Sequence, residues 1–336
     1  MTRVGVLGGG AFGTALALLC HSRGYRVRVW THEVDLPARI REEKENAPYL
    51  PGVPIPEAIE FHHDLAWALE EADLVLVVAP AQHVRSVAER ARPHLPPGAF
   101  IGCCTKGIEH GSLELMSEVL AEVLPDSVRR HAFLSGPTFA KELARGLPMD
   151  IAVASSDIET AHAVQAILHA PSFRVYAGND PIGVEMAGSL KNVIAIACGT
   201  ADELGLGLSA RASLISRGLA EITRMGVARG AHPVTFLGLA GVGDLILTCT
   251  GELSRNHTLG RLVARGGKAR EIVASQNAVA EGYFTAEPAH QLAKKLGVDA
   301  PLLEQVYYVL YQDRSIGDAM ELLMNREPKP EFLGIL

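Results

Sequence analysis

The sequence predicts an α/β domain with a parallel-rich sheet over residues 1–180, followed by an all-α domain over residues 181–336. A glycine-rich turn near the N-terminus stands between a strand-like and a helix-like segment, and apolar runs then alternate with helical patterns. From Pro181 to Leu323 helical patterns dominate, and a turn cluster at Gly178–Pro181 marks the boundary. A chain of 336 residues also exceeds what one hydrophobic core usually supports.

The N-terminal segment carries the glycine pattern of a Rossmann-type turn. Gly8, Gly10 and Gly13 follow the expected strand Thr2–Leu7 and precede the expected helix Thr14–Ser22. In this context the first glycine permits a tight turn, the second lets the backbone approach a pyrophosphate, and the third allows close helix–strand packing. The helix N-terminus then offers free N–H groups and a favourable dipole to phosphates. The pattern therefore predicts a dinucleotide cofactor.

The choice between NADH and NADPH is open in the sequence. An acidic residue that reads the ribose 2′-OH is expected at the end of the second strand, but Thr31 and His32 stand there. Glu33 could accept the 2′-OH one step later, or His32 with Arg39 or Arg41 could favour a 2′-phosphate. We interpret the cofactor as NAD(P)H, with a slight preference for NADPH.

The remaining elements of the first domain follow in order from their composition. Strands buried on both faces form continuous apolar runs, and helical patterns lie between them. The segment 31–61 is rich in charge and proline. The expected strands are Tyr25–Trp30, Leu74–Ala79, Ala99–Thr105, Ala132–Leu134, Asp150–Ala154 and Phe173–Tyr176, and the expected helices are Leu65–Glu71, Ala81–Ala91 and Leu113–Val123.

One lysine stands out in the second domain. Between Glu185 and Asp202 the chain is apolar on every helical face except for Lys191 and Asn192. A helix that is hydrophobic all round is usually buried, and a buried amine is costly unless another group satisfies it. Most helix lysines are solvated surface charges. This one is a candidate functional group because its helix lacks a charged face.

Two further candidates follow expected strands of the first domain, where such folds bind ligands. Lys106 comes directly after the strand Ala99–Thr105, although a lysine in a loop is more often a surface residue. The loop Ser135–Ala140 contains hydroxyl groups and backbone N–H groups that could hold an anion, or it is an ordinary turn.

The third candidate region is the segment Gly238–Gly260, which opens with an apolar run. Asp244 is the only charge between Arg229 and Glu252, and a buried carboxylate needs a partner such as Lys191 or Asn192. Downstream, Ser254, Arg255 and Asn256 offer a hydroxyl, a guanidinium and an amide side by side, a set suited to a phosphate. A helix N-cap at Ser254 followed by a solvated arginine is the simpler alternative.

These motifs together closely resemble the NAD(P)-dependent glycerol-3-phosphate dehydrogenases of the bacterial, biosynthetic type. The resemblance covers essentially the whole chain. It is carried, in order, by Gly8–Gly13, Thr105–Gly107, Ser135–Pro148, Lys191–Ala195, Gly241–Thr250, Ser254–Asn256 and Val279–Tyr283.

The resemblance implies a Rossmann domain, a helical domain, a homodimer, and reversible hydride transfer between NAD(P)H and dihydroxyacetone phosphate. The product, sn-glycerol 3-phosphate, would serve glycerophospholipid synthesis. Lys191 is the implied proton donor and acceptor, assisted by Lys106 and Asp244. The implied substrate contacts are Lys106, Gly136, Thr138, Lys191, Asn192, Asp244, Thr248, Ser254, Arg255 and Asn256. The implied cofactor contacts are Gly8, Gly10, Ala11, Phe12, Gly13, Thr31, His32, Lys106, Ala140, Arg255, Val279 and Glu281.

This chain departs from the family at Ala11 and Phe12, where a serine and a bulkier aromatic residue are usual; a phosphate-binding hydroxyl is thereby lost. Two rival interpretations remain. A 3-hydroxyacid or 6-phosphogluconate-type dehydrogenase would share the architecture, and a dinucleotide-sensing regulatory protein would share the glycine turn.

Bulk properties fit a cytoplasmic enzyme. With 31 basic and 38 acidic residues the net charge is −7, which predicts neither nucleic acid nor a membrane surface as partner. Apolar runs such as Leu74–Ala81 fall far short of the roughly 20 residues of a membrane span. The five cysteines lack metal-type spacing, so we expect no metal and interpret them as buried thiols of a reducing compartment.

Overall fold

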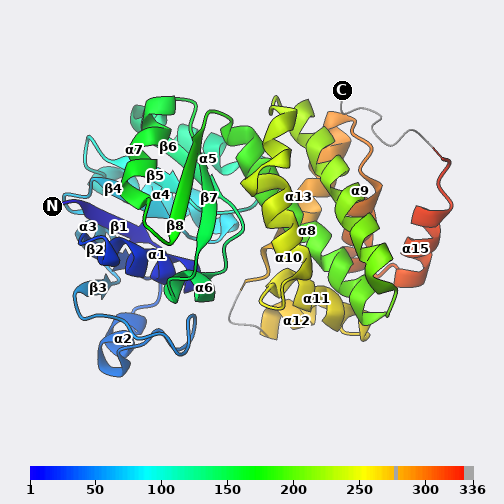
Figure 1. The fold of residues 1–336 in the computed structure, drawn as a ribbon, viewed down its shortest axis with the longest axis horizontal. Helices are drawn as coiled ribbons and strands as arrows, with labels where there is room; N and C mark the ends of the chain where they lie inside the picture. Colours follow the sequence, from blue (N-terminus) through cyan, green and yellow to red (C-terminus); the bar gives the residue numbers. More distant parts are fainter. Residues whose placement is uncertain (276–278, 329–336) are drawn as a thin grey trace. The chain divides into compact units, whose positions relative to one another are not determined.

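The computed structural model describes residues 1–275 and 279–328, and the chain folds into two compact units. The first unit consists of Met1–Thr105 and Met116–Pro181, and the second of Lys106–Leu115 and the chain from Ile182 onward (Figure 1). Each unit has its own hydrophobic core residues.

The first unit is built on an eight-stranded sheet with the strand order β3-β2-β1-β4-β5-β6-β7-β8. Every neighbouring pair is parallel except β6 and β7, which are antiparallel. This confirms the expected parallel-rich sheet. The strands are β1 (Arg3–Leu7), β2 (Arg26–Trp30), β3 (Ile59–His62), β4 (Leu74–Val77), β5 (Phe100–Cys103), β6 (His131–Ser135), β7 (Met149–Ala154) and β8 (Phe173–Gly178).

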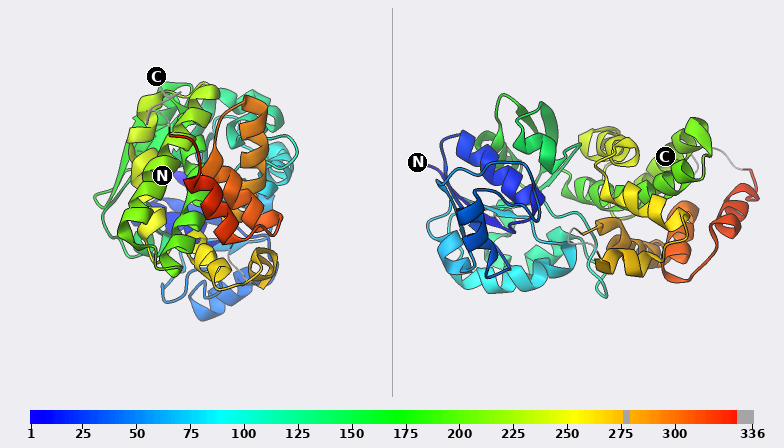
Figure 2. Two further views of the ribbon diagram at one scale, coloured as in Figure 1. Left: turned by 90° about the vertical axis from the view of Figure 1, so that its right-hand side faces the viewer. Right: turned by 90° about the horizontal axis from the view of Figure 1, so that it is seen from below.

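Helices cover both faces of this sheet (Figures 1 and 2). Alternate residues of one strand face opposite sides, so Leu74 and Leu76 join one core while Val75 and Val77 join the other. The first core contains side chains of α1, α2, α6 and α7, and the second contains those of α3, α4 and α5. The helices are α1 (Ala11–Ser22), α2 (Leu36–Glu43), α3 (Leu65–Leu69), α4 (Val84–Ala91), α5 (Met116–Val123), α6 (Ala140–Ala144) and α7 (Ile158–Leu168).

The segment 31–61 contains regular structure that its composition does not predict. It forms α2 and the edge strand β3, which pairs with β2. The strand reads IEFH, and its residues alternate between buried and half-buried positions. Four residues with such weak alternation are too short to predict as a strand from the sequence alone.

The expected helix Leu113–Val123 is wrong at its N-terminal end. The helix begins at Met116, because Leu113 has a positive φ of 63° and Leu115 forms an antiparallel bridge with Ile108. The expected helix Leu65–Glu71 likewise ends at Leu69, since Glu71 has a φ of 57°. A positive φ is strained for residues other than glycine and interrupts a helix.

The second unit is all-α apart from that one bridge, among the described residues. Its longest helix, α8, has the length and apolar composition of a membrane span, but it lies inside the unit as a core helix, with 89% of its most apolar window buried. The helices are α8 (Pro181–Glu203), α9 (Gly207–Ala228), α10 (Asp244–Thr250), α11 (Arg255–Ala264), α12 (Ala269–Ser275), α13 (Glu281–Leu296), α14 (Pro301–Tyr311) and α15 (Ile316–Met324).

A buried carboxylate joins α9 to α14. Glu221 on α9 accepts hydrogen bonds from the backbone N–H groups of Leu302 and Leu303, at 2.8 and 3.0 Å, in the first turn of α14. It thus satisfies two of the donors that every helix leaves open at its N-terminus. Burial raises the pKa of Glu221 to about 7, although these two N–H groups favour the ionised form.

This raised pKa makes the stability of the second unit depend on pH. Between the ordinary glutamate value and about 7, the folded state holds a proton at Glu221 that the unfolded state has released. The contribution of Glu221 is therefore complete at low pH and is lost as pH rises towards 7. Denaturant titrations at pH 5 and 7.5 should show that the free energy of unfolding, relative to Glu221→Gln, falls by on the order of 2 kcal/mol. An identical difference at both pH values would contradict the assignment.

Candidate active site

Lys191 lies inside the second unit, in the middle of α8, and is 5% exposed. Its ammonium group donates to Asp244 Oδ1 at 2.7 Å and to Thr248 Oγ1 at 2.6 Å. Asp244, which is 1% exposed, begins α10 and Thr248 follows one turn later, so both face α8 together. The buried amine is thus satisfied by a charged and a neutral acceptor.

The same carboxylate holds a second lysine. Lys106 donates to Asp244 Oδ2 at 2.8 Å, and the Lys106 side chain is 18% exposed. The segment 106–115 belongs to the second unit because Ile108 and Leu115 are fully buried in its core. Asp244 therefore uses one oxygen for each lysine, and the site contains two cations for one buried anion.

The pKa values follow from this arrangement. Burial lowers the pKa of Lys191 to about 8; the Asp244 carboxylate opposes the change and the Lys106 ammonium adds to it. Burial would raise the pKa of Asp244, but Lys106 and Lys191 outweigh it and hold the pKa below its ordinary value. A lysine with a pKa of about 8 exchanges protons near neutral pH, as a general acid–base group must.

Thr248 fixes the direction in which the Lys191 amine can bond. Its hydroxyl donates to the Asp244 carbonyl oxygen at 2.6 Å, within α10, and so turns a lone pair towards Lys191.

Just before α10, the stretch Leu239–Gly243 makes a wider, π-type turn. At Gly241 a Cβ atom would lie 2.0 Å from the Phe236 carbonyl oxygen, so this turn requires glycine there.

Next to Lys191 on α8, Asn192 connects three helices. Its Oδ1 accepts from Asn256 Nδ2 at 2.9 Å, and Asn256 Oδ1 accepts from the backbone N–H of Gly282 at 2.9 Å. Asn256 belongs to α11 and Gly282 to α13. The two amides therefore hold the starts of α11 and α13 against the lysine-bearing helix.

The start of α11 has the form of an anion-binding helix N-terminus. Ser254 is the N-cap, and its hydroxyl accepts from the N–H of His257 at 3.2 Å. The N–H groups of Arg255 and Asn256 are the first of the helix and cannot bond within it. With the exposed Arg255 guanidinium and the helix dipole, they favour a bound phosphate.

Two glycines bring α8 and α11 into backbone contact. A Cβ atom at Gly199 would lie 2.0 Å from the His257 carbonyl oxygen, and one at Gly260 would lie 2.0 Å from the Ile196 carbonyl oxygen. The helix with Lys191 and the helix with Arg255 are thus held at a distance that no larger residue allows at these two positions.

Charged residues at the end of α8 reinforce this contact. Asp202 Oδ2 accepts from His257 Nε2 and from an Arg211 guanidinium, each at 2.8 Å. The next residue, Glu203, binds Arg261 and Arg265 further along α11 at 2.9 and 2.7 Å. Asp202 therefore anchors the first turn of α11, and Glu203 anchors its later turns.

The first unit contains the glycine turn as the sequence predicts. Gly8 has a φ of +130°, and a Cβ atom at Gly13 would lie 1.9 Å from the Gly8 carbonyl oxygen, so only glycines allow α1 to begin this close to β1. Gly10 has open space beside it, where a backbone can approach a pyrophosphate. Ala11 and Phe12 open α1. These residues fit a dinucleotide.

The loop after β6 also lies in the first unit. Gly136 packs against β7, where a Cβ atom would lie 2.9 Å from Ile151 Cα. The Thr138 hydroxyl donates to the Gly136 carbonyl oxygen at 3.3 Å, and Ala140 begins α6. Five cysteines lie in the described residues of both units, all of them buried and none in a disulfide there: Cys20, Cys103, Cys104, Cys198 and Cys249.

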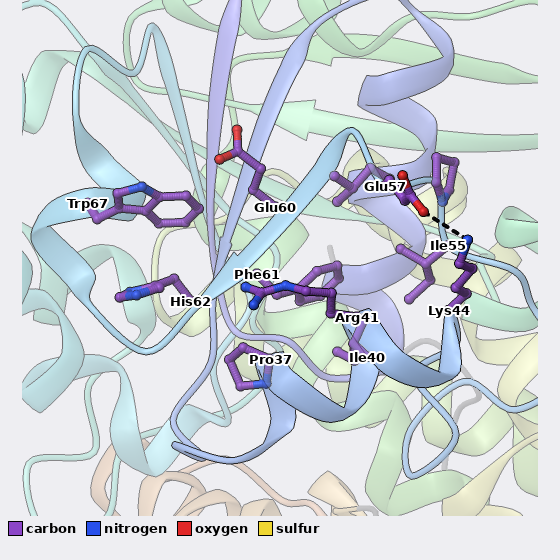
Figure 3. Close-up of a pocket in the computed structure, with 12 residues that line it drawn as sticks. Pro37, Ile40, Arg41, Lys44, Ile55, Glu57, Glu60, Phe61, His62 and Trp67 are labelled. Carbon is purple, nitrogen blue, oxygen red and sulfur yellow. Dashed lines mark hydrogen bonds and ion pairs between the residues drawn. The ribbon is translucent and has the colours of Figure 1, made fainter.

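A pocket of about 580 Å³ lies beside α2 and β3 in the first unit (Figure 3). Arg41 extends into it near Phe61 and His62, and Lys44 at its rim pairs with Glu57 at 2.8 Å. Of the two arginines considered for a 2′-phosphate, Arg39 instead pairs with Glu43 at 3.6 Å.

The expected site residues thus fall into two groups. One group lies in the second unit, where hydrogen bonds or a shared place at the start of α11 join its members: Lys106, Lys191, Asn192, Asp244, Thr248, Ser254, Arg255 and Asn256. Val279 and Glu281 also belong to this unit; Val279 lies just ahead of α13, and Glu281 begins it. The others belong to the first unit: Gly8, Gly10, Ala11, Phe12, Gly13, Thr31, His32, Gly136, Thr138 and Ala140.

Sequence reasoning did not find Asp202 and His257, nor Asn46 and Tyr49 beside the glycine turn. Acids at the end of an apolar helix look like ordinary solvated residues. A buried asparagine in the polar segment 31–61 has no periodic signal at all. Their partners become visible only in three dimensions.

Comparison with known proteins agrees with this geometry. Residues 3–161 match the family model for the N-terminus of NAD-dependent glycerol-3-phosphate dehydrogenase, and residues 180–321 match the model for its C-terminus. A glycerol-3-phosphate dehydrogenase [NAD(P)+] of Syntrophotalea carbinolica is 47% identical over 330 residues, 98% of this chain and 99% of the relative. One from Myxococcus xanthus is 45% identical over 334 residues, 99% of this chain and 100% of the relative.

Solved structures give the same result. The crystal structure of glycerol-3-phosphate dehydrogenase from Coxiella burnetii superimposes with a TM-score of 0.91 at 37% identity, covering 97% of this chain and 99% of the other. Because both family models and full-length relatives match across both units, this chain belongs to the NAD-dependent glycerol-3-phosphate dehydrogenase family.

Proposed function

We propose that this chain is an NAD(P)-dependent sn-glycerol-3-phosphate dehydrogenase that reversibly reduces dihydroxyacetone phosphate. One observation carries the proposal: a buried lysine, whose pKa burial lowers to about 8, is held by Asp244 within the same helical unit as the N-capped start of α11, which has the form of an anion site. Family membership supports the same reaction.

Lys191 is the proposed proton donor and acceptor. When bound, the reduced nicotinamide supplies the hydride for the C2 carbonyl carbon of the substrate. The Lys191 ammonium gives a proton to the oxygen that becomes the hydroxyl, and in the opposite direction the neutral amine removes it. Asp244 and Thr248 keep the Lys191 amine in one orientation. Lys106, which is held by the same carboxylate, is the proposed second donor for the substrate oxygen that becomes the hydroxyl.

The substrate phosphate is proposed to bind at the start of α11. The Arg255 guanidinium and the N–H groups of Arg255 and Asn256 are its donors there, and Ser254 holds the first turn as N-cap. Asn192 and Asn256 bond to each other, so their proposed role is to position this turn relative to Lys191. Contacts from Gly136 and Thr138 are proposed from the family resemblance.

The proposed assembly is a homodimer. Within the second unit, several large apolar side chains are exposed, among them Leu208 (72%), Val234 (62%) and Leu237 (69%). Where such groups lie together in one patch they mark an interface between subunits, and the dimer is proposed on this ground and on the family resemblance. Sedimentation equilibrium at micromolar concentration should give twice the chain mass; the mass of one chain would refute the dimer. The buried cysteines, which form no disulfide among the described residues, support a cytoplasmic location, where the product would enter glycerophospholipid synthesis.

The activity is tested by following nicotinamide oxidation with dihydroxyacetone phosphate, using NADH and NADPH in parallel. We expect oxidation that depends on this substrate and is far weaker with unphosphorylated dihydroxyacetone. Oxidation only with carboxylate-bearing substrates would indicate a hydroxyacid dehydrogenase instead. Dinucleotide binding without turnover of any hydroxy or keto substrate would indicate a sensor.

Replacing Lys191 tests the proton step. Lys191→Ala should lower turnover by about 10²–10⁴-fold while leaving dinucleotide binding intact, since a positioned acid–base group contributes on that order. Lys295→Met, which removes an exposed lysine of the same unit, is the matched control. Near-normal turnover in Lys191→Ala, or loss of dinucleotide binding, would contradict the role.

The pH profile gives a sharper test of the same site. With a Lys191 pKa of about 8, oxidation of glycerol 3-phosphate should rise with pH through about 8, and reduction of dihydroxyacetone phosphate should fall. Asp244→Asn removes the charge that raises this pKa, so the midpoint should move to lower pH. Lys106→Met removes a cation that lowers it, so the midpoint should move to higher pH. If the pH midpoints of Asp244→Asn and Lys106→Met moved in the same direction, this explanation of the Lys191 pKa would be refuted.

The bonds of Asp202 and Glu203 to α11 predict that replacing these two residues affects KM for dihydroxyacetone phosphate differently. Asp202→Asn weakens the hold on the first turn of α11, so KM for dihydroxyacetone phosphate should rise about 3–10-fold, the size of one weakened hydrogen bond to a charged group. The kcat/KM for unphosphorylated dihydroxyacetone should stay constant. Glu203→Gln, one residue along, should leave both values unchanged because Glu203 holds only the later turns. Equal effects of the two variants would mean that Asp202 only stabilises the fold.

A further inference from the structure

The turn after β2 points to a choice between the two dinucleotides that the sequence leaves open. In Rossmann-type folds, a carboxylate near the end of the second strand accepts a hydrogen bond from the adenosine ribose 2′-OH of NADH. Here Thr31, the first residue after β2, is fully buried, and its hydroxyl donates to the Glu33 carbonyl oxygen at 2.8 Å. This bond holds the short turn that presents Glu33.

A tyrosine from a distant part of the segment 31–61 holds the Glu33 side chain. The Tyr49 hydroxyl donates to Glu33 Oε1. Burial and the neighbouring carboxylate raise the pKa of Tyr49 to about 12, so the phenol keeps its proton and remains a donor. The other oxygen, Oε2, has no partner among the described residues and is free to accept a hydrogen bond.

This tyrosine is itself attached to the glycine turn. The N–H groups of Tyr49 and Leu50 donate to the Asn46 carbonyl oxygen at 3.1 and 2.7 Å. Asn46 is fully buried, and its Nδ2 donates to the Gly9 carbonyl oxygen at 2.8 Å and to Thr14 Oγ1 at 2.9 Å. A continuous set of hydrogen bonds therefore connects the pyrophosphate-binding turn, through Asn46 and Tyr49, to the carboxylate of Glu33.

The two arginines that could instead serve a 2′-phosphate are engaged or lie elsewhere. Arg39 pairs with Glu43, and Arg41 extends into the pocket beside Phe61 and His62 (Figure 3). Within residues 1–275 and 279–328, no lysine or arginine forms an ion pair with Glu33. A 2′-phosphate next to Glu33 would meet an uncompensated negative charge, which is costly at short range.

We infer that Glu33 is the ribose-reading carboxylate, that Tyr49 is its positioning residue, and that this chain therefore prefers NADH to NADPH. The inference rests on the proposed function for the presence of a dinucleotide, and it reverses the slight preference for NADPH expected from sequence alone. Glu33 both accepts the 2′-OH of one cofactor and repels the 2′-phosphate of the other, so a single side chain acts in both directions.

Equilibrium binding of the two reduced dinucleotides, measured by nicotinamide fluorescence without substrate, tests the inference. Wild type should bind NADH at least about tenfold more tightly than NADPH, the size of one charge-assisted hydrogen bond. Glu33→Gln should reduce this ratio about tenfold, with NADPH binding more tightly than before. Tyr49→Phe should weaken NADH by a few-fold, because the carboxylate remains but is no longer held.

Two matched variants separate this account from its alternatives. Glu43→Gln removes a carboxylate from the same segment and should leave the ratio unchanged. Arg41→Gln should not affect NADPH; a selective loss of NADPH affinity would place the 2′-phosphate in the Figure 3 pocket and overturn the inference. Equal or tighter binding of NADPH by wild type, or an unchanged ratio in both Glu33→Gln and Tyr49→Phe, would also overturn it.

The binding measurement and the proposed activity can fail separately. NADH preference without turnover of dihydroxyacetone phosphate would refute the dehydrogenase activity and leave the role of Glu33 standing. Turnover of dihydroxyacetone phosphate with a preference for NADPH would leave the dehydrogenase activity standing and refute the role of Glu33. Absence of binding for either dinucleotide would refute both.

Discussion

The ion pairs of Asp244 are the interactions on which the rest of the site depends. A carboxylate this deeply buried would be strongly destabilising alone, and so would the Lys191 ammonium. Each satisfies the other, and Lys106 takes the remaining oxygen. Because removal of one member leaves an unpaired buried charge, α8, α10 and the segment 106–115 must come together in one arrangement. The geometry of the lysines is therefore a condition for folding the second unit as well as for the proposed proton transfer.

The helix α8 makes this arrangement possible through its composition. Small residues along it allow other backbones to approach, most closely where Gly199 and Gly260 bring α11 against it. Apolar side chains exclude water around Lys191, which lowers its pKa. The anchors at its end, Asp202 and Glu203, then fix α11 along its length. One helix thus supplies the proposed acid–base group, its low-dielectric surroundings and the backbone against which the proposed phosphate site is held.

Much of this was predictable from the sequence because its signals are local. The glycine turn needs only neighbouring residues, the apolar context of Lys191 and Asp244 shows in a single window each, and Ser254 was recognisable as an N-cap. The elements that were not predicted depend on distant partners. The edge strand β3 exists because β2 pairs with it. The sequence placed the segment 106–115 in the first domain, yet Ile108 and Leu115 fill the core of the second unit. Tyr49 has a role only because Asn46 attaches it to the glycine turn.

In the proposed reaction, the charges around Asp244 also connect proton transfer to substrate binding. With both lysines protonated, the buried set carries one net positive charge, and loss of the Lys191 proton leaves the balanced pair of Lys106 and Asp244. Burial is the main cause of the low pKa of Lys191; the Lys106 ammonium adds to it, and the Asp244 carboxylate opposes it. At the phosphate site proposed for the start of α11, a phosphorylated substrate would bring negative charge to the unit that contains this set, and would so favour the protonated lysine again. By linkage, binding of that anion and protonation of Lys191 must strengthen each other to the same degree. An enzyme that reduces a phosphorylated ketone gains from this coupling, since the proton donor becomes charged when its substrate arrives.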